Sequence, residues 1–138
     1  MTVSDISFTF DMSQVDWAWL KQRLVDDEFD NGRTPEQYRI SFENSYAVIF
    51  ALHNGEIVGK ARVLSDGVCN SYIVDVWTYT PYRHRGIASE MLKRLEEKLE
   101  GQHVYLTTDD AMELYLKCGY RQQDVGMGKV VGRWLKNK

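Results

Sequence analysis

The chain has 138 residues, 43% of them hydrophobic, a length that suits one domain (residues 1–138). Seventeen basic against twenty acidic residues give a net charge of −3, which argues against a nucleic-acid or anionic-membrane partner. No apolar run approaches the roughly 20 residues of a membrane-spanning helix. No signal peptide is visible, and Cys69 and Cys118 lack metal or disulfide spacing. A cytoplasmic or similarly reducing location is expected.

The first residues predict a short strand followed by a helix. Residues 6–10 fit the strand, and Asp11 or Ser13 is expected to cap the helix, which ends near residues 26–29. The apolar face of this helix carries Trp17, Leu20 and Leu24.

A second short helix is predicted by the segment Thr34-Pro35-Glu36-Gln37. It combines an N-cap threonine, a proline at the first helical position and a glutamine that can close a capping box. The helix should extend to about Phe42.

The middle of the chain predicts antiparallel strands. Residues 46–53 and 56–64 are β-rich and are joined by Asn54-Gly55, a strong signal for a two-residue hairpin turn. Residues 72–79 form a third strand, apolar apart from Asp75 and therefore expected at the centre of the sheet.

The last part alternates helices and strands. A helix should begin at Ile87 and end near Gly101; its apolar stripe carries Ile87, Met91, Leu92, Leu95 and Leu99. Residues 103–107 predict a strand, and Asp109 or Asp110 should cap a helix that carries Tyr115 and ends at Gly119. Residues 129–135 are expected to close the fold as a strand.

The junction between the 72–79 strand and the Ile87 helix, Arg83-His84-Arg85-Gly86-Ile87-Ala88, is typical of a phosphate-binding site. The amides of a first helical turn are unpaired and carry partial positive charge, and Gly86 permits close approach of a ligand. Arg83 and Arg85 add charge, so a pyrophosphate cradle is predicted.

The pattern Arg83-x-x-Gly86-x-Ala88 resembles the acetyl-CoA loop of the GNAT N-acetyltransferases, with Pro81 and Tyr82 before it. The segment Ala111-x-x-x-Tyr115-x-x-x-Gly119-Tyr120 is similar to that family's second signature, Ala-x-x-x-Tyr-x-x-x-Gly-Phe. The resemblance implies the α/β GNAT fold, a mixed central sheet with helices on both faces. It also implies that the strands of residues 72–79 and 103–107 splay apart and that pantetheine inserts between them.

The resemblance implies a set of residues for binding acetyl-CoA. They are Trp77, Thr78 and Tyr79 through their backbone, the loop residues Arg83, His84, Arg85, Gly86, Ile87, Ala88 and Ser89, and Thr108 and Lys117. Thr108 stands where many members carry an asparagine, so the pantetheine contact there is open. Lys117 could equally be a solvated surface residue, and no metal is expected.

Acetyl transfer requires a neutral amine, stabilisation of a tetrahedral intermediate and a proton for the departing thiolate. By resemblance Tyr115 protonates the thiolate; the alternative is an aromatic core residue. Asp75 is the first candidate for a general base, because an aspartate inside an apolar strand is paired or has a raised pKa. An Asp75 satisfied by a neighbouring arginine or backbone amide is the alternative. Asp26, Asp27 and Glu28 could attract an amine or face water.

The segment Gly59 to Gly67, with Asn70 and residues 75–77, resembles the plastid and cyanobacterial GNAT branch of serotonin-type arylalkylamine acetyltransferases. The implied acceptor is a small amine or a protein lysine or N-terminus, and a homodimer is possible. A CoA-binding sensor without turnover is the competing interpretation.

Overall fold

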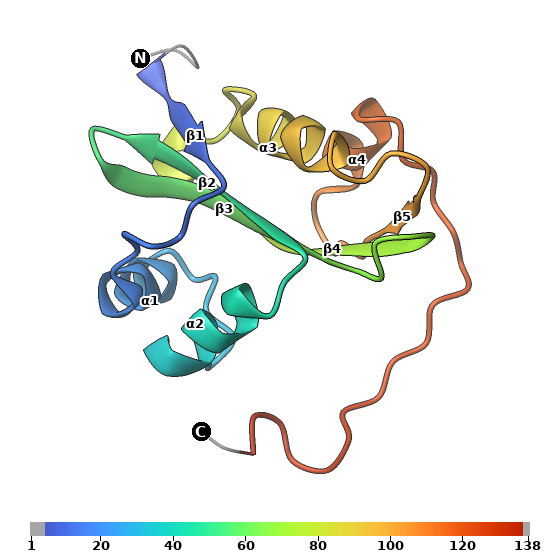
Figure 1. The fold of residues 1–138 in the computed structure, drawn as a ribbon. Coiled ribbons are helices and arrows are strands. Elements are labelled where there is room, and N and C mark those ends of the chain that lie inside the picture. The colour runs from blue at the N-terminus through green and yellow to red at the C-terminus, as the bar shows by residue number, and fades with distance from the viewer. Residues whose placement is uncertain (1–4, 137–138) are drawn as a thin grey trace.

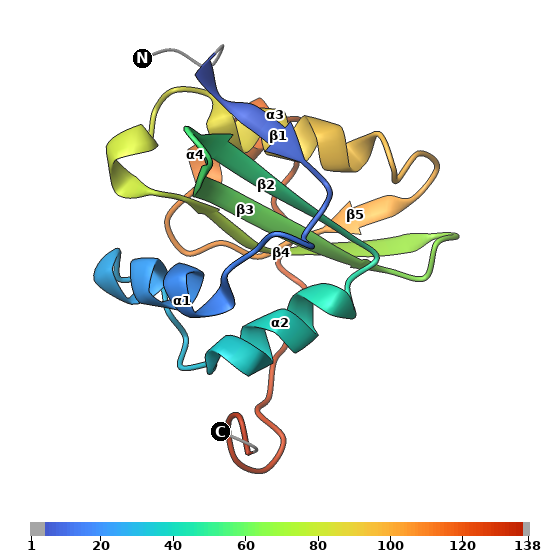
Figure 2. The ribbon, with the colours of Figure 1, turned by 60° about the vertical axis from the view of Figure 1, so that its left-hand side comes forward.

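The computed structural model describes residues 5–136, in which a five-stranded sheet separates two helical layers. The strands, in spatial order, are β1 (Ser7–Thr9), β2 (Ala47–His53), β3 (Glu56–Ser65), β4 (Asn70–Thr78) and β5 (His103–Tyr105). The first four pair antiparallel, and β5 pairs parallel to β4. Helices α1 (Trp17–Asp26) and α2 (Pro35–Glu43) cover one face, while α3 (Ile87–Glu96) and α4 (Met112–Lys117) lie on the other (Figures 1 and 2). The predicted mixed α/β sheet is confirmed.

The β2–β3 hairpin forms as predicted. Asn54 has a φ of +52° and Gly55 a φ of +80°. A type I′ turn requires positive φ at both central residues, which asparagine and glycine tolerate best. The turn therefore sets the register of the two strands.

Local capping explains where the first two helices begin. The capping box of α2 is present in full, with Thr34 accepting from Gln37 and Gln37 reaching back to Thr34. Helix α1 begins later than expected, because Asp16 is its N-cap and accepts from the Trp19 amide. The predicted cap Asp11 instead accepts from both the amide and the hydroxyl of Ser13 in a preceding turn.

Two hydrophobic cores hold the helical layers to the sheet. Leu20 and Leu24 of α1 are fully buried against the sheet, together with Trp77 of β4. On the other face the predicted stripe of α3 is buried throughout. Helix α3 ends at Glu96 rather than near Gly101, and residues 97–102 continue in tight turns that keep Leu99 buried.

Strand β4 contains a bulge at the predicted site residue Asp75. Lys60 pairs with Trp77, but Arg62 pairs with Val74, so one extra residue of β4 lies between these pairs. Asp75 has a φ of +60°. A bulge of this kind bends a strand and redirects its side chains, often beside a functional site.

The strands β4 and β5 separate after a short parallel contact. Their pairing covers Asn70–Tyr72 against His103–Tyr105, whereas β4 continues to Thr78. The expected splay is therefore present. After Tyr72, the edge of β4 that faces away from β3 has no neighbouring strand among the described residues.

The predicted strand at residues 129–135 is absent. Residues 121–136 form neither helix nor strand and run from α4 past β4 and β5 to the far side of α2 (Figures 1 and 2). The β-rich composition does not produce a strand here, because the segment has no partner strand with which to pair within residues 5–136. Its docking contact is a hydrogen bond of 3.1 Å from Trp134 Nε1 to the Asn31 carbonyl.

No helix within residues 5–136 has the length and apolar character to cross a bilayer.

Candidate active site

The loop between β4 and α3 presents unpaired backbone amides. Gly86 is the N-cap of α3 with a φ of +81°, and no side chain caps this helix. The first backbone bond of the helix is from the Glu90 amide to the Gly86 carbonyl. The amides from Gly86 to Ser89 therefore have no acceptor within the helix. They give this ten-residue helix an N-terminus that is suited to bind a diphosphate.

The side chains of this loop differ in their surroundings. Arg83 turns back and its Nε donates to the Thr78 carbonyl at 3.1 Å, so it braces the loop. The guanidinium of Arg85 lies 5.9 Å from the centre of the Tyr82 ring. Ile87 is buried in the core, and the hydroxyl of Ser89 meets the Cys118 thiol at 3.7 Å. His84 is exposed with a φ of +64°.

Asp27 ties the end of α1 to this loop. Its Oδ2 accepts from Trp77 Nε1 at 3.0 Å and from the Thr80 amide at 3.2 Å, and it lies 3.9 Å from Arg83. The side chain is 8% exposed. Asp27 is therefore committed to positioning the loop, which corrects the expectation that it would attract an amine or face water.

The strand register decides which backbone groups at the end of β4 point into the gap between β4 and β5. The Tyr79 amide donates to the Val58 carbonyl at 2.8 Å, so the backbone groups of Tyr79 face β3. Those of Trp77 face the same way, because alternate residues of a strand point to the same side. The register thus turns the backbone groups of Trp77 and Tyr79 toward β3 and leaves the Thr78 amide facing the gap, while the Thr78 carbonyl accepts from Arg83.

Thr78 also has a buried polar atom without a partner. Among the described residues, its Oγ1 is the only fully covered side-chain oxygen or nitrogen that lacks a hydrogen bond. Such a group normally finds a partner, but protein atoms cover this oxygen completely, so a ligand would reach it only after the surrounding atoms move.

Tyr115 on α4 is a buried phenol beside a hollow. It is 7% exposed, and no described residue accepts or donates a hydrogen bond at its hydroxyl. The hollow is about 790 Å³ and lies along β5 and α4. Burial, with smaller effects from Cys118 and Asp110, raises the pKa of Tyr115 to about 12. The phenol therefore stays protonated at neutral pH, the form that can donate a proton.

Thr108 and Lys117 flank Tyr115 with different surroundings. Thr108 Oγ1 accepts from the Ala111 amide at 2.9 Å, so this hydroxyl holds the start of α4. The predicted caps Asp109 and Asp110 do not serve there, since Ala111 is the N-cap and no carboxylate bonds to it. Lys117 is exposed in the last turn of α4.

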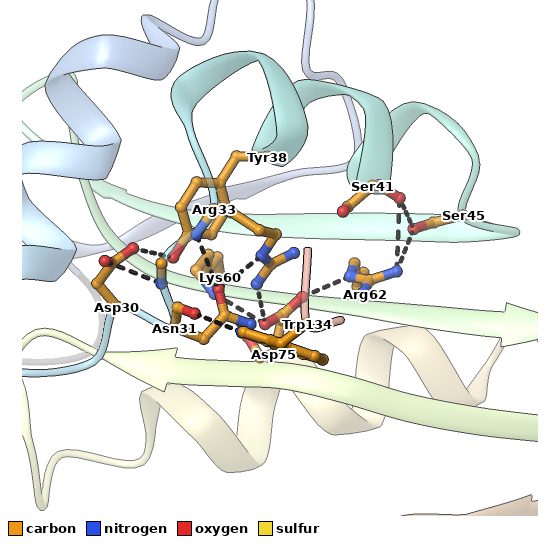
Figure 3. A network of polar contacts seen from close by, with 11 residues as sticks. Asp30, Asn31, Arg33, Tyr38, Ser41, Ser45, Lys60, Arg62, Asp75 and Trp134 are labelled. Carbon is orange, nitrogen blue, oxygen red and sulfur yellow. Dashed lines mark hydrogen bonds and ion pairs between the residues drawn. The ribbon is translucent and has the colours of Figure 1, made fainter. Parts of the chain in front are cut away.

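Asp75 lies at the centre of a basic cluster, which we define as Arg33, Lys60 and Arg62 (Figure 3). Arg33 Nη2 is 2.7 Å from Asp75 Oδ1, and Arg62 Nε is 2.5 Å from Oδ2. Lys60 Nζ lies 3.8 Å from Oδ1 and donates to the Asp75 carbonyl at 3.1 Å.

The charges of this cluster set the pKa values of its members. Burial alone would raise the pKa of Asp75, but the charge of Lys60 and the bonds from both arginines hold it well below its usual range. Burial lowers the pKa of Lys60 to about 8, with repulsion from Arg33 and Arg62 acting in the same direction and Asp75 opposing. Asp75 is thus a stable carboxylate with little tendency to accept a proton.

The loop between α1 and α2 holds Arg33 in place. Arg33 Nε donates to Asn31 Oδ1 at 3.0 Å, and its guanidinium carbon lies 4.1 Å from the centre of the Tyr38 ring. The Tyr38 hydroxyl donates to Asp30 at 2.7 Å, and Asp30 also pairs with Lys21. Hydrogen bonds to Asn31 and Asp75, together with the Tyr38 ring, therefore hold the Arg33 guanidinium beside β4.

The alternative that an arginine satisfies Asp75 is confirmed, but sequence reasoning did not identify the residues of the basic cluster. Lys60 and Arg62 stand two apart in an apolar strand and therefore share one face of the sheet. Two basic residues on a face that should be covered by helices were the available signal that Asp75 has cationic partners. No pattern indicated Arg33, which comes from a loop.

Within the described residues, no group of three His, Cys, Asp or Glu side chains converges to hold a metal ion.

Comparisons with known proteins give a family match. A sequence model described as the Acetyltransferase (GNAT) family matches residues 11–120. No curated protein sequence matched this chain.

Solved structures share the fold. A GNAT family acetyltransferase from Streptococcus pneumoniae superposes with a TM-score of 0.74 at 20% identity, covering 94% of this chain and 98% of the other. Glucosamine-6-phosphate N-acetyltransferase from Arabidopsis thaliana gives a TM-score of 0.74 at 16% identity, covering 92% and 99%. An aminoglycoside acetyltransferase from an uncultured soil sample gives 0.65 at 22% identity, covering 93% and 98%. At these identities the likeness establishes the fold.

Proposed function

Because this chain belongs to the GNAT family of acetyltransferases, we propose that it moves an acetyl group from acetyl-CoA to a primary amine. The observation that carries this proposal is the pairing of β4 with β5, which stops at Tyr72 and leaves the edge up to Thr78 open beside an uncapped helix N-terminus. One site thus offers backbone partners for an amide-containing arm and for a diphosphate.

The chain's own residues fit the coenzyme in two places. The amides from Gly86 to Ser89 would hold the diphosphate, and the backbone amide of Thr78 would meet the pantetheine arm. Thr108 and Lys117 stay candidates for further coenzyme contacts, as do the side chains of His84 and Arg85. The thioester supplies an activated acetyl group.

Transfer by direct attack requires few groups from the protein. The amine nitrogen forms a bond to the thioester carbonyl carbon, the carbon–sulfur bond breaks, and the amine loses one proton. Tyr115 donates its phenolic proton to the departing sulfur, which its buried, protonated state supports. The phenolate regains a proton from water.

Asp75 suits a positioning role better than the role of general base. A carboxylate that two guanidinium groups bond and whose pKa is lowered is a weak proton acceptor. We therefore assign to Asp75 the shaping of the β4 bulge, and to water the removal of the amine proton.

Several kinds of amine are candidate acceptors. The names of the Arabidopsis and soil-sample enzymes give amino sugars and aminoglycosides as their acceptors, which are amines. The resemblance of residues 59–67, Asn70 and residues 75–77 to the serotonin-type branch supports an arylalkylamine, and a protein lysine or N-terminus is a further candidate.

The test follows free thiol release from acetyl-CoA with the purified protein and a panel of arylalkylamines, polyamines, amino acids and lysine peptides. The thermal shift caused by CoA is measured alongside. Amine-dependent thiol release supports the proposal. A CoA-induced shift without turnover of any amine would contradict it and favour a binding module; no shift and no turnover would remove the coenzyme site as well.

A further inference from the structure

We propose that the acceptor carries an anionic group, a carboxylate in the first instance, and that Arg33 and Arg62 bind it beside Asp75. This inference deepens the proposed function and rests on it. It distinguishes an amino-acid-like acceptor from a simple arylalkylamine, because only the former brings a negative charge to the site.

The first argument is the balance of buried charge. Three cationic side chains, Arg33, Lys60 and Arg62, surround the single carboxylate of Asp75, and their side chains are 7%, 1% and 15% exposed. The nearest other ion pair, Lys21 with Asp30, is already balanced. Burying unpaired charge is costly, so the excess positive charge favours an anion that arrives from outside.

The second argument is the unused donors of the two arginines. Arg33 uses Nε for Asn31 and Nη2 for Asp75, while Arg62 uses Nε for Asp75 and Nη1 for Ser41 and Ser45. Arg33 Nη1 and Arg62 Nη2 have no partner among the described residues.

Both unused nitrogens keep some exposure. Among the described residues, the only fully covered side-chain nitrogen or oxygen without a hydrogen bond is Thr78 Oγ1. Arg33 Nη1 and Arg62 Nη2 are therefore not fully covered, while the rest of each guanidinium is hydrogen-bonded. A fixed guanidinium with a free donor is suited to bind a carboxylate or phosphate oxygen.

The third argument is position. Asp75 lies at the bulge, one residue before the Val76–Thr78 segment that borders the β4–β5 gap. The diphosphate cradle belongs to α3, on one face of the sheet, whereas the basic cluster lies on the face covered by α1 and α2 (Figures 2 and 3). An acceptor that enters from the α2 face would place its amine at the gap and its anionic group on the cluster.

The C-terminal segment supports an opening on that side. Trp134 comes from residues 121–136 and rests by one hydrogen bond on the Asn31 carbonyl, next to the cluster (Figure 3). The residue is 56% exposed. A half-exposed cover that makes one side-chain hydrogen bond can move aside to admit a small molecule.

The test compares acceptors that differ only in the anionic group. Each L-amino acid is paired with its carboxamide, for example tyrosine with tyrosine amide, and phosphoethanolamine is paired with ethanolamine. The carboxamide has the more acidic amine, so a preference for the acid cannot come from easier deprotonation. We expect kcat/KM to be at least about tenfold higher for the anionic member, the effect of one charge-assisted hydrogen bond.

Variants then locate the preference. Arg62→Gln and, separately, Arg33→Gln should lower the acid-to-amide ratio about tenfold while the CoA-induced thermal shift stays unchanged. Arg39→Gln is the matched control, because Arg39 lies on α2 and pairs with Glu36 and Glu43 rather than Asp75. Two separate variants keep the test valid if one of them misfolds. The acid-to-amide ratio of the wild-type protein tests the proposal without any variant.

Each outcome decides between the proposals. Turnover of acids and amides at equal kcat/KM overturns the anion site and leaves the acetyltransferase proposal intact. Preference for the phosphate member alone would identify a phosphorylated acceptor at the same cluster. If no amine is acetylated, the proposed function fails, and calorimetry on the CoA-loaded protein with each pair tests the site directly: Arg62-dependent binding of the anionic member supports it, and equal or absent binding of both overturns it.

Discussion

Lys60 donates from its fully buried Nζ to the backbone carbonyl of Asp75 at 3.1 Å, so a side chain of β3 closes the bulge of β4. A bulge leaves backbone groups without ladder partners, and an unpaired carbonyl here would be costly. The same ammonium lies 3.8 Å from the Asp75 carboxylate. The bulge and the basic cluster therefore depend on each other.

The two partners should differ in their effect on stability. Asp75→Asn leaves three buried cations without a counter-charge and should lower the free energy of unfolding by about 3 kcal/mol or more. Lys60→Met removes a cation from a cluster that has an excess but leaves the Asp75 carbonyl without its donor, so its loss should be smaller, about 1–2 kcal/mol. Urea unfolding of both proteins checks this, with Asp109→Asn as an exposed control. Equal losses for the two variants would show that the charge excess has no energetic effect.

Lys60 should make the protein more stable as the pH rises above about 8. Its pKa is lowered from 10.5 to about 8, so between these values the folded protein binds fewer protons than the unfolded chain. Stability rises with pH wherever the unfolded state binds more protons. The gain should be about 1.5 kcal/mol between pH ~8 and ~9.5.

The comparison with Lys60→Met isolates this effect. The variant keeps every other titrating group but should lack the rise. The range must end below pH ~10, because the raised pKa values of Tyr38, Tyr115 and Tyr120 reverse the slope above that. Parallel curves for the two proteins would show that Lys60 titrates normally in the folded state.

Most of the fold could be predicted from local signals. Asn54-Gly55, the Thr34 capping box and the stripe of α3 each depend on neighbours in sequence, and all three are confirmed. The strand expected at residues 129–135 failed, because a strand needs a partner edge that composition does not provide.

The part of the site that is one continuous segment could be predicted from the sequence. The part formed by residues distant in sequence could not. The loop from Arg83 to Ser89 is one continuous segment, so its helix N-terminus could be located. Arg33 reaches Asp75 over 42 positions. The bulge that turns Asp75 toward it is a register shift between strands, which no periodicity within one strand reveals.

Gly86 should be required for the coenzyme beyond its effect on the backbone. Its φ of +81° is nearly that of Gly55, +80°, so alanine at either position should cost about 1 kcal/mol of stability. Gly86→Ala also places a methyl group where the diphosphate would approach, and CoA affinity should fall about tenfold or more.

Gly55→Ala is the matched control, since a Cβ there meets nothing within 4 Å and the hairpin carries no predicted coenzyme contact. Calorimetric titration with CoA measures both proteins. An unchanged affinity of Gly86→Ala would show that the loop does not approach the coenzyme closely.

Tyr115→Phe should abolish proton donation while leaving coenzyme binding intact. The hydroxyl bonds to no described residue and the ring packs edge-on against Tyr120, so phenylalanine keeps the packing. Loss of a general acid lowers turnover by about 10²-fold or more. The rate of thiol release from acetyl-CoA at saturating amine gives kcat, and the CoA-induced thermal shift reports whether the coenzyme still binds.

The pH profile separates this role from a structural one. With a pKa of about 12, Tyr115 stays protonated to pH ~10, so kcat of the wild-type protein should not fall on the alkaline side between pH ~7 and ~10. Tyr115→Phe should keep the same stability in that range but lower kcat at every pH. Undiminished kcat in the variant would assign the proton to another group, and a wild-type decline near pH ~9 would point to a donor with a lower pKa than Tyr115.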